Sequence, residues 1–217
     1  MQSNKNIFEF YQSSGIYDRV IFRKNNESKL DKLNKLKLKI LNLKEIYNKK
    51  DDQIVFFDGD THSNVMIVGD APGVVDEINC KPFSGEIGKL LNKMLAAINL
   101  DRSKVYLTNI INFRLSDNKM PSKIDILRFK PLIEEHIDII NPQIIFLLGF
   151  VTLKVFFENK ISIIEARGKW FKLEIKGKQI DCIMSFHPQF LSMQPQQKKL
   201  SWEDLKKLKA KINERNL

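Results

Sequence analysis

Hydrophobic residues follow two different patterns along the chain, and the change between them predicts its organisation. In residues 28–47, leucines and isoleucines recur at helical spacing among many lysines, which predicts an amphipathic helix with a basic, solvated face. A shorter helix is predicted near residues 8–14, because Gly15 follows it. We expect the longer helix to pack against the rest of the protein, although its basic face leaves contact with a polyanion open.

From about residue 64 the pattern changes to short, continuous apolar runs separated by amphipathic segments. Strands are predicted at residues 65–68, 105–108, 143–148 and 180–186. Helices are predicted at residues 88–98, 123–140, 152–158 and 202–213. Uninterrupted apolar strands between helices are typical of a parallel sheet covered on both faces. The sequence therefore predicts an α/β fold: a three-layer α/β/α sandwich whose central, mostly parallel sheet has four strands.

The turn-rich segment at residues 58–63 marks the boundary between the two patterns. We divide the chain into an N-terminal helical extension, residues 1–60, and a main domain, residues 61–217. A chain of 217 residues is long enough for one α/β domain with a sizeable core, and a second full domain is not expected.

Polar residues with useful chemistry follow the predicted strands. In chain order, the strands end at Gly69 and Asp70, at Asn109, at Gly149 and at His187. The carboxyl ends of parallel strands meet at one edge of a sheet, and ligands bind there. We therefore expect a carboxylate, a carboxamide and an imidazole to lie at one rim.

Together these groups suit the cleavage of a glycosidic bond. The carboxylate of Asp70 could stabilise positive charge on a sugar and orient water, while the imidazole of His187 could bond to a departing base. Asn109 offers a donor and an acceptor to the edge of a pyrimidine, and Phe83 offers a ring for stacking. Taken singly, Asp70 is explained as a helix cap, Asn109 as a turn residue and His187 as a structural histidine. The segment at residues 69–73 lacks phosphate-loop and dinucleotide motifs, which disfavours a nucleotide-dependent enzyme.

The composition is compatible with a nucleic-acid partner inside a cell. Lys and Arg number 36 against 26 Asp and Glu, and this net charge of +10 attracts polyanions, although a lysine-rich proteome explains it equally well. Cys80 and Cys182 are too few for a disulfide framework or an all-cysteine metal site. The sequence has neither a membrane-spanning apolar run nor the apolar stretch of a signal peptide. We expect a soluble, cytoplasmic protein that does not bind membranes.

The order of short motifs over residues 65–208 resembles that of family 4 uracil-DNA glycosylases. GDAPG at 69–73, KPFSG at 81–85 and GKLL at 88–91 look like the first motif region. VYLTN at 105–109, followed by Arg114 and Pro121, is similar to the second region. HPQFL at 187–191, QP at 194–195 and WEDL at 202–205 resemble the third motif and its following helix. The resemblance implies the three-layer fold and the removal of uracil from DNA, and our leading hypothesis for this chain involves no metal or organic cofactor.

Carried over residue by residue, the resemblance implies three groups of site residues. The catalytic residues would be Asp70 at the position of the motif-one acid, Asn109 bonding the polar edge of uracil, and His187 stabilising the uracil anion. The uracil would be bound by Gly69, Ala71, Phe83 and Asn109, with Phe83 stacking on the base. The DNA strand would be contacted by Pro72, Gly73, Arg114, Gln194, Pro195, Lys198 and Lys199. No residue is expected to bind a metal, and the protein is expected to act as a monomer.

The chain departs from the family pattern at two places. Many members carry four cysteines that bind an iron–sulfur cluster, whereas Phe113 and Phe129 stand here where two of them usually lie. Two cysteines cannot supply a normal cluster, so we predict none and expect the N-terminal helix to brace the domain instead. The family also usually has glutamate where this chain has the shorter Asp70, with Asp76 and Glu77 as nearby substitutes.

These departures leave two hypotheses open. The leading one is a glycosylase that hydrolyses the N-glycosidic bond of deoxyuridine in DNA and leaves an abasic site. The alternative is a catalytically weak or inactive relative that binds damaged or single-stranded DNA. Both predict salt-sensitive DNA binding, so only turnover separates them.

Overall fold

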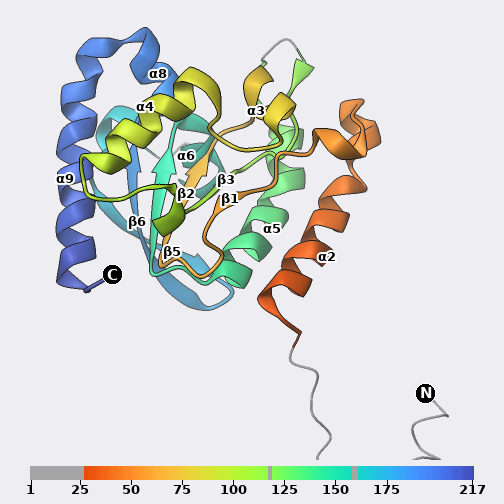
Figure 1. The fold of residues 1–217 in the computed structure, drawn as a ribbon, viewed down its shortest axis with the longest axis horizontal. Helices are drawn as coiled ribbons and strands as arrows, with labels where there is room; N and C mark the ends of the chain where they lie inside the picture. The colour runs from red at the N-terminus through yellow and green to blue at the C-terminus, as the bar shows by residue number, and fades with distance from the viewer. Residues whose placement is uncertain (1–26, 117–118, 158–160) are drawn as a thin grey trace, which may run out of the picture.

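The computed structural model describes residues 27–116, 119–157 and 161–217, which form one sheet with helices on both faces (Figure 1). The strand order is β1-β3-β2-β4-β6-β5. The strands are β1 (Asp58–Gly59), β2 (Val65–Gly69), β3 (Tyr106–Asn109), β4 (Ile144–Leu148), β5 (Trp170–Ile175) and β6 (Lys178–Ser185). The central strands β3, β2, β4 and β6 are parallel, while β1 and β5 pair antiparallel at the edges. The predicted α/β class with a mostly parallel sheet is confirmed.

The sheet is wider than predicted, and the count of four strands is corrected to six. The four predicted strands are the central parallel ones. β1 contains two residues, which is too short to give a pattern. In β5 the exposed Lys172 and Glu174 alternate with the buried Leu173 and Ile175, so this edge strand lacks a continuous apolar run.

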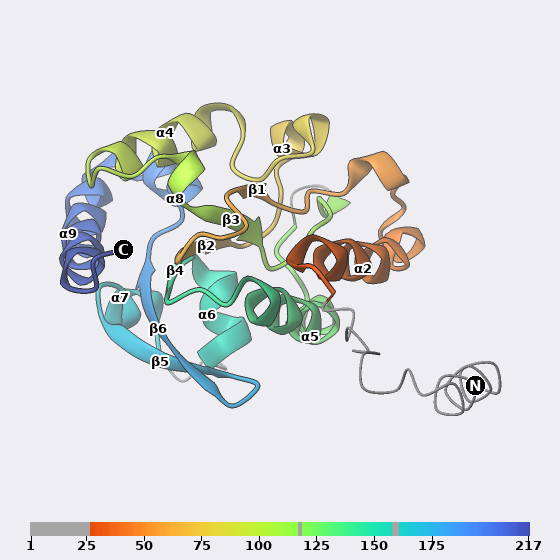
Figure 2. The same ribbon diagram turned by 60° about the horizontal axis from the view of Figure 1, so that its bottom comes forward.

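Helices cover both faces of the sheet as outer layers (Figure 2). They are α2 (Lys29–Leu41), α3 (Val74–Asn79), α4 (Gly85–Ala96), α5 (Lys123–Ile140), α6 (Phe150–Phe157), α7 (Ile163–Ala166), α8 (Pro188–Met193) and α9 (Lys198–Glu214). One face is covered by α2, α5 and α6, and the other by α4, α8 and α9. Alternate residues of β2 serve the two layers, with Met66 and Val68 in the first and Val65 and Ile67 in the second. The helices α3, α7 and α8 were not predicted, because such short segments show little periodicity.

The helix of the N-terminal extension contributes to the core of the main domain. Leu33, Leu36 and Ile40 of α2 are at most 1% exposed and belong to the same buried cluster as the inner face of α5. The expected packing of this helix is confirmed, although it ends at Leu41 and a 3-10 turn (Lys44–Tyr47) replaces its last part. The boundary at residue 60 stays a prediction. The helix predicted near residues 8–14 lies outside the described residues.

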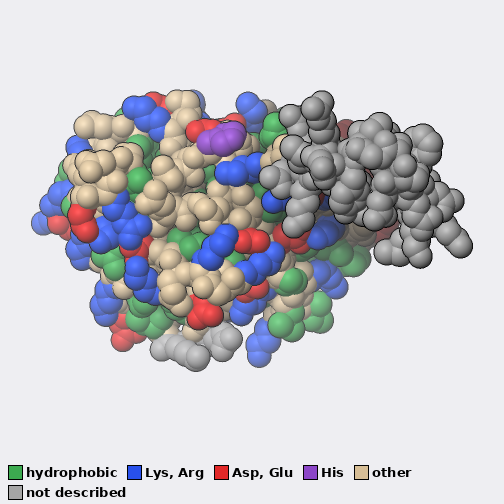
Figure 3. All heavy atoms as spheres, turned by 90° about the horizontal axis from the view of Figure 1, so that it is seen from below, with side chains coloured by type: hydrophobic (Ala, Val, Ile, Leu, Met, Phe, Trp, Pro, Cys, Tyr) green, Lys and Arg blue, Asp and Glu red, His purple; other side chains and the backbone are tan. Residues whose placement is uncertain are grey.

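The face at the amino ends of the strands carries basic and acidic side chains intermixed (Figure 3). At this end of the sheet, Asp181 pairs with Lys172 and Arg215, and Asp138 pairs with Lys176 and Lys178. These pairs offset part of the surplus positive charge there. Within the part of the chain that the structure describes, no helix has the length and apolarity needed to cross a membrane.

Candidate active site

A pocket of about 390 Å³ opens at the carboxyl ends of β2 and β3. Its lining includes Asp70, Ala71, Pro72, Gly73, Phe83, Asn109 and His187. Gly69 and Asn109 are paired residues of the adjacent strands β2 and β3, which brings the two motifs together. The pocket thus lies at the carboxyl edge of the parallel strands, where the sequence predicted a ligand site, and its volume suits a small planar ligand.

The side chain of Asp70 lies between the end of β2 and the first turn of α6. Its Oδ1 accepts hydrogen bonds from the backbone N–H groups of Val151 (3.0 Å) and Thr152 (3.2 Å). Burial nevertheless raises the pKa of Asp70 to about 7, while these two N–H groups act to lower it. Gly149 has φ +107°, and a Cβ there would lie 2.5 Å from the Asp70 carboxylate, so only glycine fits beside the acid. Asp70 does cap a helix, but one that is remote in sequence.

Asn109 presents a buried polar group without a partner. The side chain is 2% exposed, and its Nδ2 forms no hydrogen bond within the described residues. A Cβ on Gly69 would lie 2.5 Å from both Asn109 Oδ1 and Phe83 Cζ, so the glycine lets these two side chains meet. An unpaired buried amide costs about 1–3 kcal/mol, and it marks a place where a ligand's acceptor would fit.

The rings of Phe83 and His187 are stacked, with centroids 5.7 Å apart and an interplanar angle of 27°. His187 Nδ1 accepts a hydrogen bond from the Gln189 N–H (3.2 Å) at the start of α8. Burial lowers the pKa of His187 to about 4, so the ring is neutral at pH 7. Since Nδ1 is the acceptor, we assign the proton to Nε2, which can donate to a ligand.

The two substitute acids considered from the sequence have other contacts. Asp76 accepts from Gly73 N–H (2.8 Å) and from Ser84 N–H (2.5 Å), so it ties together two loops of the pocket. Glu77 pairs with Lys49 and Arg114, and although burial opposes them, their hydrogen bonds hold the pKa of Glu77 below its ordinary value. These contacts favour Asp70 as the acid of the site.

The residues expected to contact DNA fall into three places. Pro72 and Gly73 line the pocket. Four lie exposed around the α8–α9 connection, namely Gln194, Pro195, Lys198 and Lys199. Arg114 is only partly exposed. Its Nε donates to Glu77 (2.8 Å), so Arg114 links its own loop to α3.

Several pocket residues were not found from the sequence. They include Val75, Ser84, Ile87, Leu115, Met120 and Val151. The amides that bond Asp70 carry no side-chain signal, and the apolar residues resemble those of any core. The KPFSG segment was the one available sign for Ser84.

The residues present do not fit an iron–sulfur cluster. Phe113 and Phe129, at two of the usual ligand positions, pack with Tyr47 at centroid distances of 5.6 Å each. Cys80 is exposed after α3, whereas Cys182 is buried in β6. In residues 27–116, 119–157 and 161–217, no three His, Cys, Asp or Glu side chains gather as metal ligands. Aromatic side chains thus stand at the two positions where the resemblance would place cysteine ligands.

The comparisons with known proteins agree with the site. A sequence model of the uracil DNA glycosylase superfamily matches residues 56–208. The type-4 uracil-DNA glycosylase of Sulfurisphaera tokodaii is 35% identical over 70% of this chain and 71% of that protein. The type-4 enzymes of Saccharolobus solfataricus and Archaeoglobus fulgidus are 32% and 30% identical, over 72% and 69% of this chain and 74% and 77% of their own lengths. The matched segment spans the pocket and most of the chain, and the chain therefore belongs to the uracil DNA glycosylase superfamily.

Proposed function

We propose that this protein hydrolyses the N-glycosidic bond of deoxyuridine in DNA, releasing uracil and leaving an abasic site. One observation carries the proposal: a buried, unpaired carboxamide at Asn109 adjoins a stacked Phe83–His187 pair in one pocket. A pyrimidine needs an amide at its edge and a ring on its face, and this pocket provides both. The type-4 uracil-DNA glycosylases named above support this choice of substrate.

The geometry supports a specific division of labour. The target nucleotide leaves the stack and enters the pocket, because the glycosidic carbon is inaccessible in stacked DNA. Asn109 bonds the polar edge of uracil, with Gly69 and Ala71 beside it, while Phe83 stacks on the ring. The neutral His187 donates from Nε2 to the uracil oxygen on which negative charge develops as the bond breaks. This hydrogen bond stabilises the negative charge that uracil acquires in the transition state.

Asp70 acts in its ionised form. Its carboxylate stabilises the positive charge that develops on the sugar and orients the attacking water. With a pKa of about 7, roughly half of the protein carries this carboxylate at neutral pH. The pH therefore controls how much of the enzyme is active.

Contacts at the mouth of the pocket and beyond it position the DNA strand. Pro72 and Gly73 approach it at the mouth of the pocket, and Arg114 stabilises the neighbouring loop. Gln194 and Pro195, with Lys198 and Lys199 beyond them, contact sugar and phosphate. We propose that the protein works as a monomer in the cytoplasm and without an iron–sulfur cluster. Iron analysis and the absorption spectrum of purified protein test the last point, and about four irons per chain would contradict it.

The alternative is a DNA-binding relative that has lost turnover. The position of Asp70 favours it, because the shorter carboxylate bonds the amides of α6 and has a raised pKa. Such a protein would bind uracil-containing DNA in a salt-sensitive manner without cleaving it.

A turnover assay separates the two functions. A fluorescent oligonucleotide containing uracil, single-stranded or opposite guanine, is incubated with the protein, and alkali cleaves any abasic sites. We expect multiple turnovers by the wild type and greatly reduced rates for Asp70→Ala and His187→Ala. Intact DNA across uracil and other deaminated bases, despite tight binding, would leave the binding function.

A further inference from the structure

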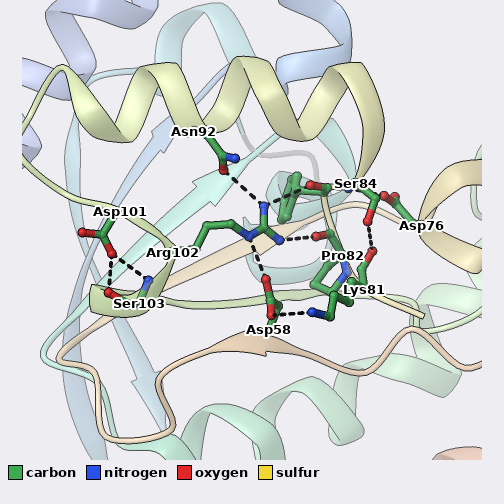
Figure 4. A network of polar contacts seen from close by, with 10 residues as sticks. Asp58, Asp76, Lys81, Pro82, Ser84, Asn92, Asp101, Arg102 and Ser103 are labelled. Carbon is green, nitrogen blue, oxygen red and sulfur yellow. Dashed lines mark hydrogen bonds and ion pairs between the residues drawn. The ribbon is translucent and has the colours of Figure 1, made fainter. Parts of the chain in front are cut away.

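Arg102 lies outside the pocket but holds the loop that forms one of its walls (Figure 4). It starts a 3-10 turn (Arg102–Lys104) that leads into β3, the strand ending at Asn109. Its Nη1 donates to the Phe83 carbonyl (3.0 Å), and its Nη2 donates to the Pro82 carbonyl (2.7 Å). One guanidinium thus links the strand that delivers the carboxamide to the loop that delivers the stacking ring.

The guanidinium is itself held in place from two sides. Its Nε donates to Asp58 Oδ2 (2.7 Å) on β1, and Nη1 also reaches Asn92 Oδ1 (3.3 Å) on α4. Asp58 is fixed by the pairing of β1 with β3. The side chains of Arg102 and Asp58 are 25% and 22% exposed, so the pair is partly shielded from water. A planar fork that bonds four neighbouring residues at once cannot be reproduced by a lysine.

The backbone conformation of Phe83 explains why these hydrogen bonds from Arg102 are needed. Its φ is +53°, in the left-handed region that bulky residues rarely adopt. Its carbonyl is pressed against α4, where a Cβ on Gly88 would lie 1.9 Å from the Phe83 oxygen. Residues in this conformation persist when their surroundings fix them, and here the fixing groups are the guanidinium and the glycine.

We propose that Arg102, oriented by Asp58, is a positioning residue that sets the plane of Phe83 and so the angle at which the extruded base stacks. The inference rests on the proposed function and names a residue that acts on catalysis through Phe83 without touching the substrate. A small tilt of the ring displaces the base from Asn109 and His187, and displacements of about 1 Å cost up to about 100-fold in rate.

The test compares Arg102→Met with a matched control, Arg215→Met. Arg215 is 30% exposed, pairs with Asp181 and donates to the Gln143 carbonyl (3.2 Å), but it lies at the opposite end of the sheet. Single-turnover excision of uracil is measured well below the melting temperature of each variant. We expect Arg102→Met to lower the chemical rate about 10- to 100-fold with little change in KM, and Arg215→Met to stay within about 2-fold of wild type. Arg102→Lys should recover only part of the rate.

A double-mutant cycle then asks whether Arg102 acts through the ring. In a Phe83→Ala background, adding Arg102→Met should change the rate by less than about 3-fold, because there is no ring left to position. An equal loss in both backgrounds would show that Arg102 acts independently of Phe83 and would overturn the inference.

Hydrogen exchange gives a readout that does not depend on turnover. In Arg102→Met, the amides of residues 83–88 should exchange faster than in wild type and in Arg215→Met. Unchanged exchange there would overturn the inference whether or not the protein excises uracil. A wild type without turnover would instead contradict the proposed function, and the exchange data alone would then decide the role of Arg102.

Discussion

His136 and His187 both have a lowered pKa, but their surroundings differ. His136, inside α5, is 1% exposed, bonds the Tyr106 hydroxyl through Nε2 (2.5 Å) and stacks on Phe56 at 4.8 Å. His187, at the end of β6, lies at the wall of the pocket against Phe83. Burial lowers the pKa of both, to about 3 for His136 and about 4 for His187. Neither ring is charged at neutral pH.

The comparison teaches that a depressed pKa reports burial and does not identify chemistry. His136 bonds another side chain of the core, so its role is structural. His187 uses Nδ1 within the protein and leaves Nε2 for a ligand. The same distinction separates the paired Asp181 at the amino end of the sheet from the unpaired amide of Asn109 at the carboxyl end. A free polar atom facing a cavity is the better sign of function.

The largest effect should come from removing the donor at His187. We expect His187→Ala to lower the rate of uracil excision about 100- to 1000-fold, the usual cost of losing one donor to a developing anion. Single-turnover kinetics measure it, and a melting temperature near that of wild type serves as the control. A loss below about 5-fold would make His187 as structural as His136.

The next largest effect concerns Asn109, where function and stability should move in opposite directions. Asn109→Leu removes the unpaired amide, so we expect a rate about 10- to 100-fold lower. The free energy of unfolding should be unchanged or higher by up to about 1 kcal/mol, since no buried donor is left unsatisfied. Urea denaturation and excision assays on the same sample test both, and a large loss of stability would mean that the amide has a partner in the folded protein.

The raised pKa of Asp70 predicts an acid-sensitive rate. Between pH 6 and pH 8 the ionised fraction rises from roughly one tenth to nine tenths, so the rate should increase about 10-fold. Folded protein binds the proton more tightly than unfolded chain, so the contribution of Asp70 to stability falls as pH rises from about 4 to about 7. Asp70→Asn should flatten both profiles. A rate that is constant over pH 6–8 in the wild type would contradict this assignment.

The smallest effect on activity should come from His136→Ala. Because the ring is enclosed by Phe56 and Tyr106, we expect the free energy of unfolding to fall by about 2–4 kcal/mol. The excision rate per folded molecule should stay within about 2-fold of wild type. Denaturation and active-site titration together separate the two, and a selective loss of rate would erase the contrast with His187.

The centre of the fold was predictable because each buried strand is a continuous apolar run. The same reasoning placed Asp70, Asn109 and His187 at one edge, since parallel strands share their carboxyl ends. It missed β5, where exposed Lys172 and Glu174 alternate with buried residues. Only strand pairing makes such a segment part of the sheet.

Contacts between segments distant in the chain could not be predicted from the sequence. The hydrogen bonds from Val151 and Thr152 to Asp70 come from backbone amides about 80 positions away. Because every residue but proline has such an amide, the side chains give no sign of these bonds. The resemblance implied that Arg114 contacts DNA, which stays a prediction, but it did not indicate that its Nε bonds Glu77. A charge on the sequence does not show which acid lies next to it in space.

The packed rings of Tyr47, Phe113 and Phe129 have a consequence for how this part of the core forms in the cell. Aromatic side chains arrive with the polypeptide, so this part of the core forms without a delivery system for metal or sulfide. We therefore expect these three rings to pack in the same way in protein made in iron-poor and in iron-rich medium.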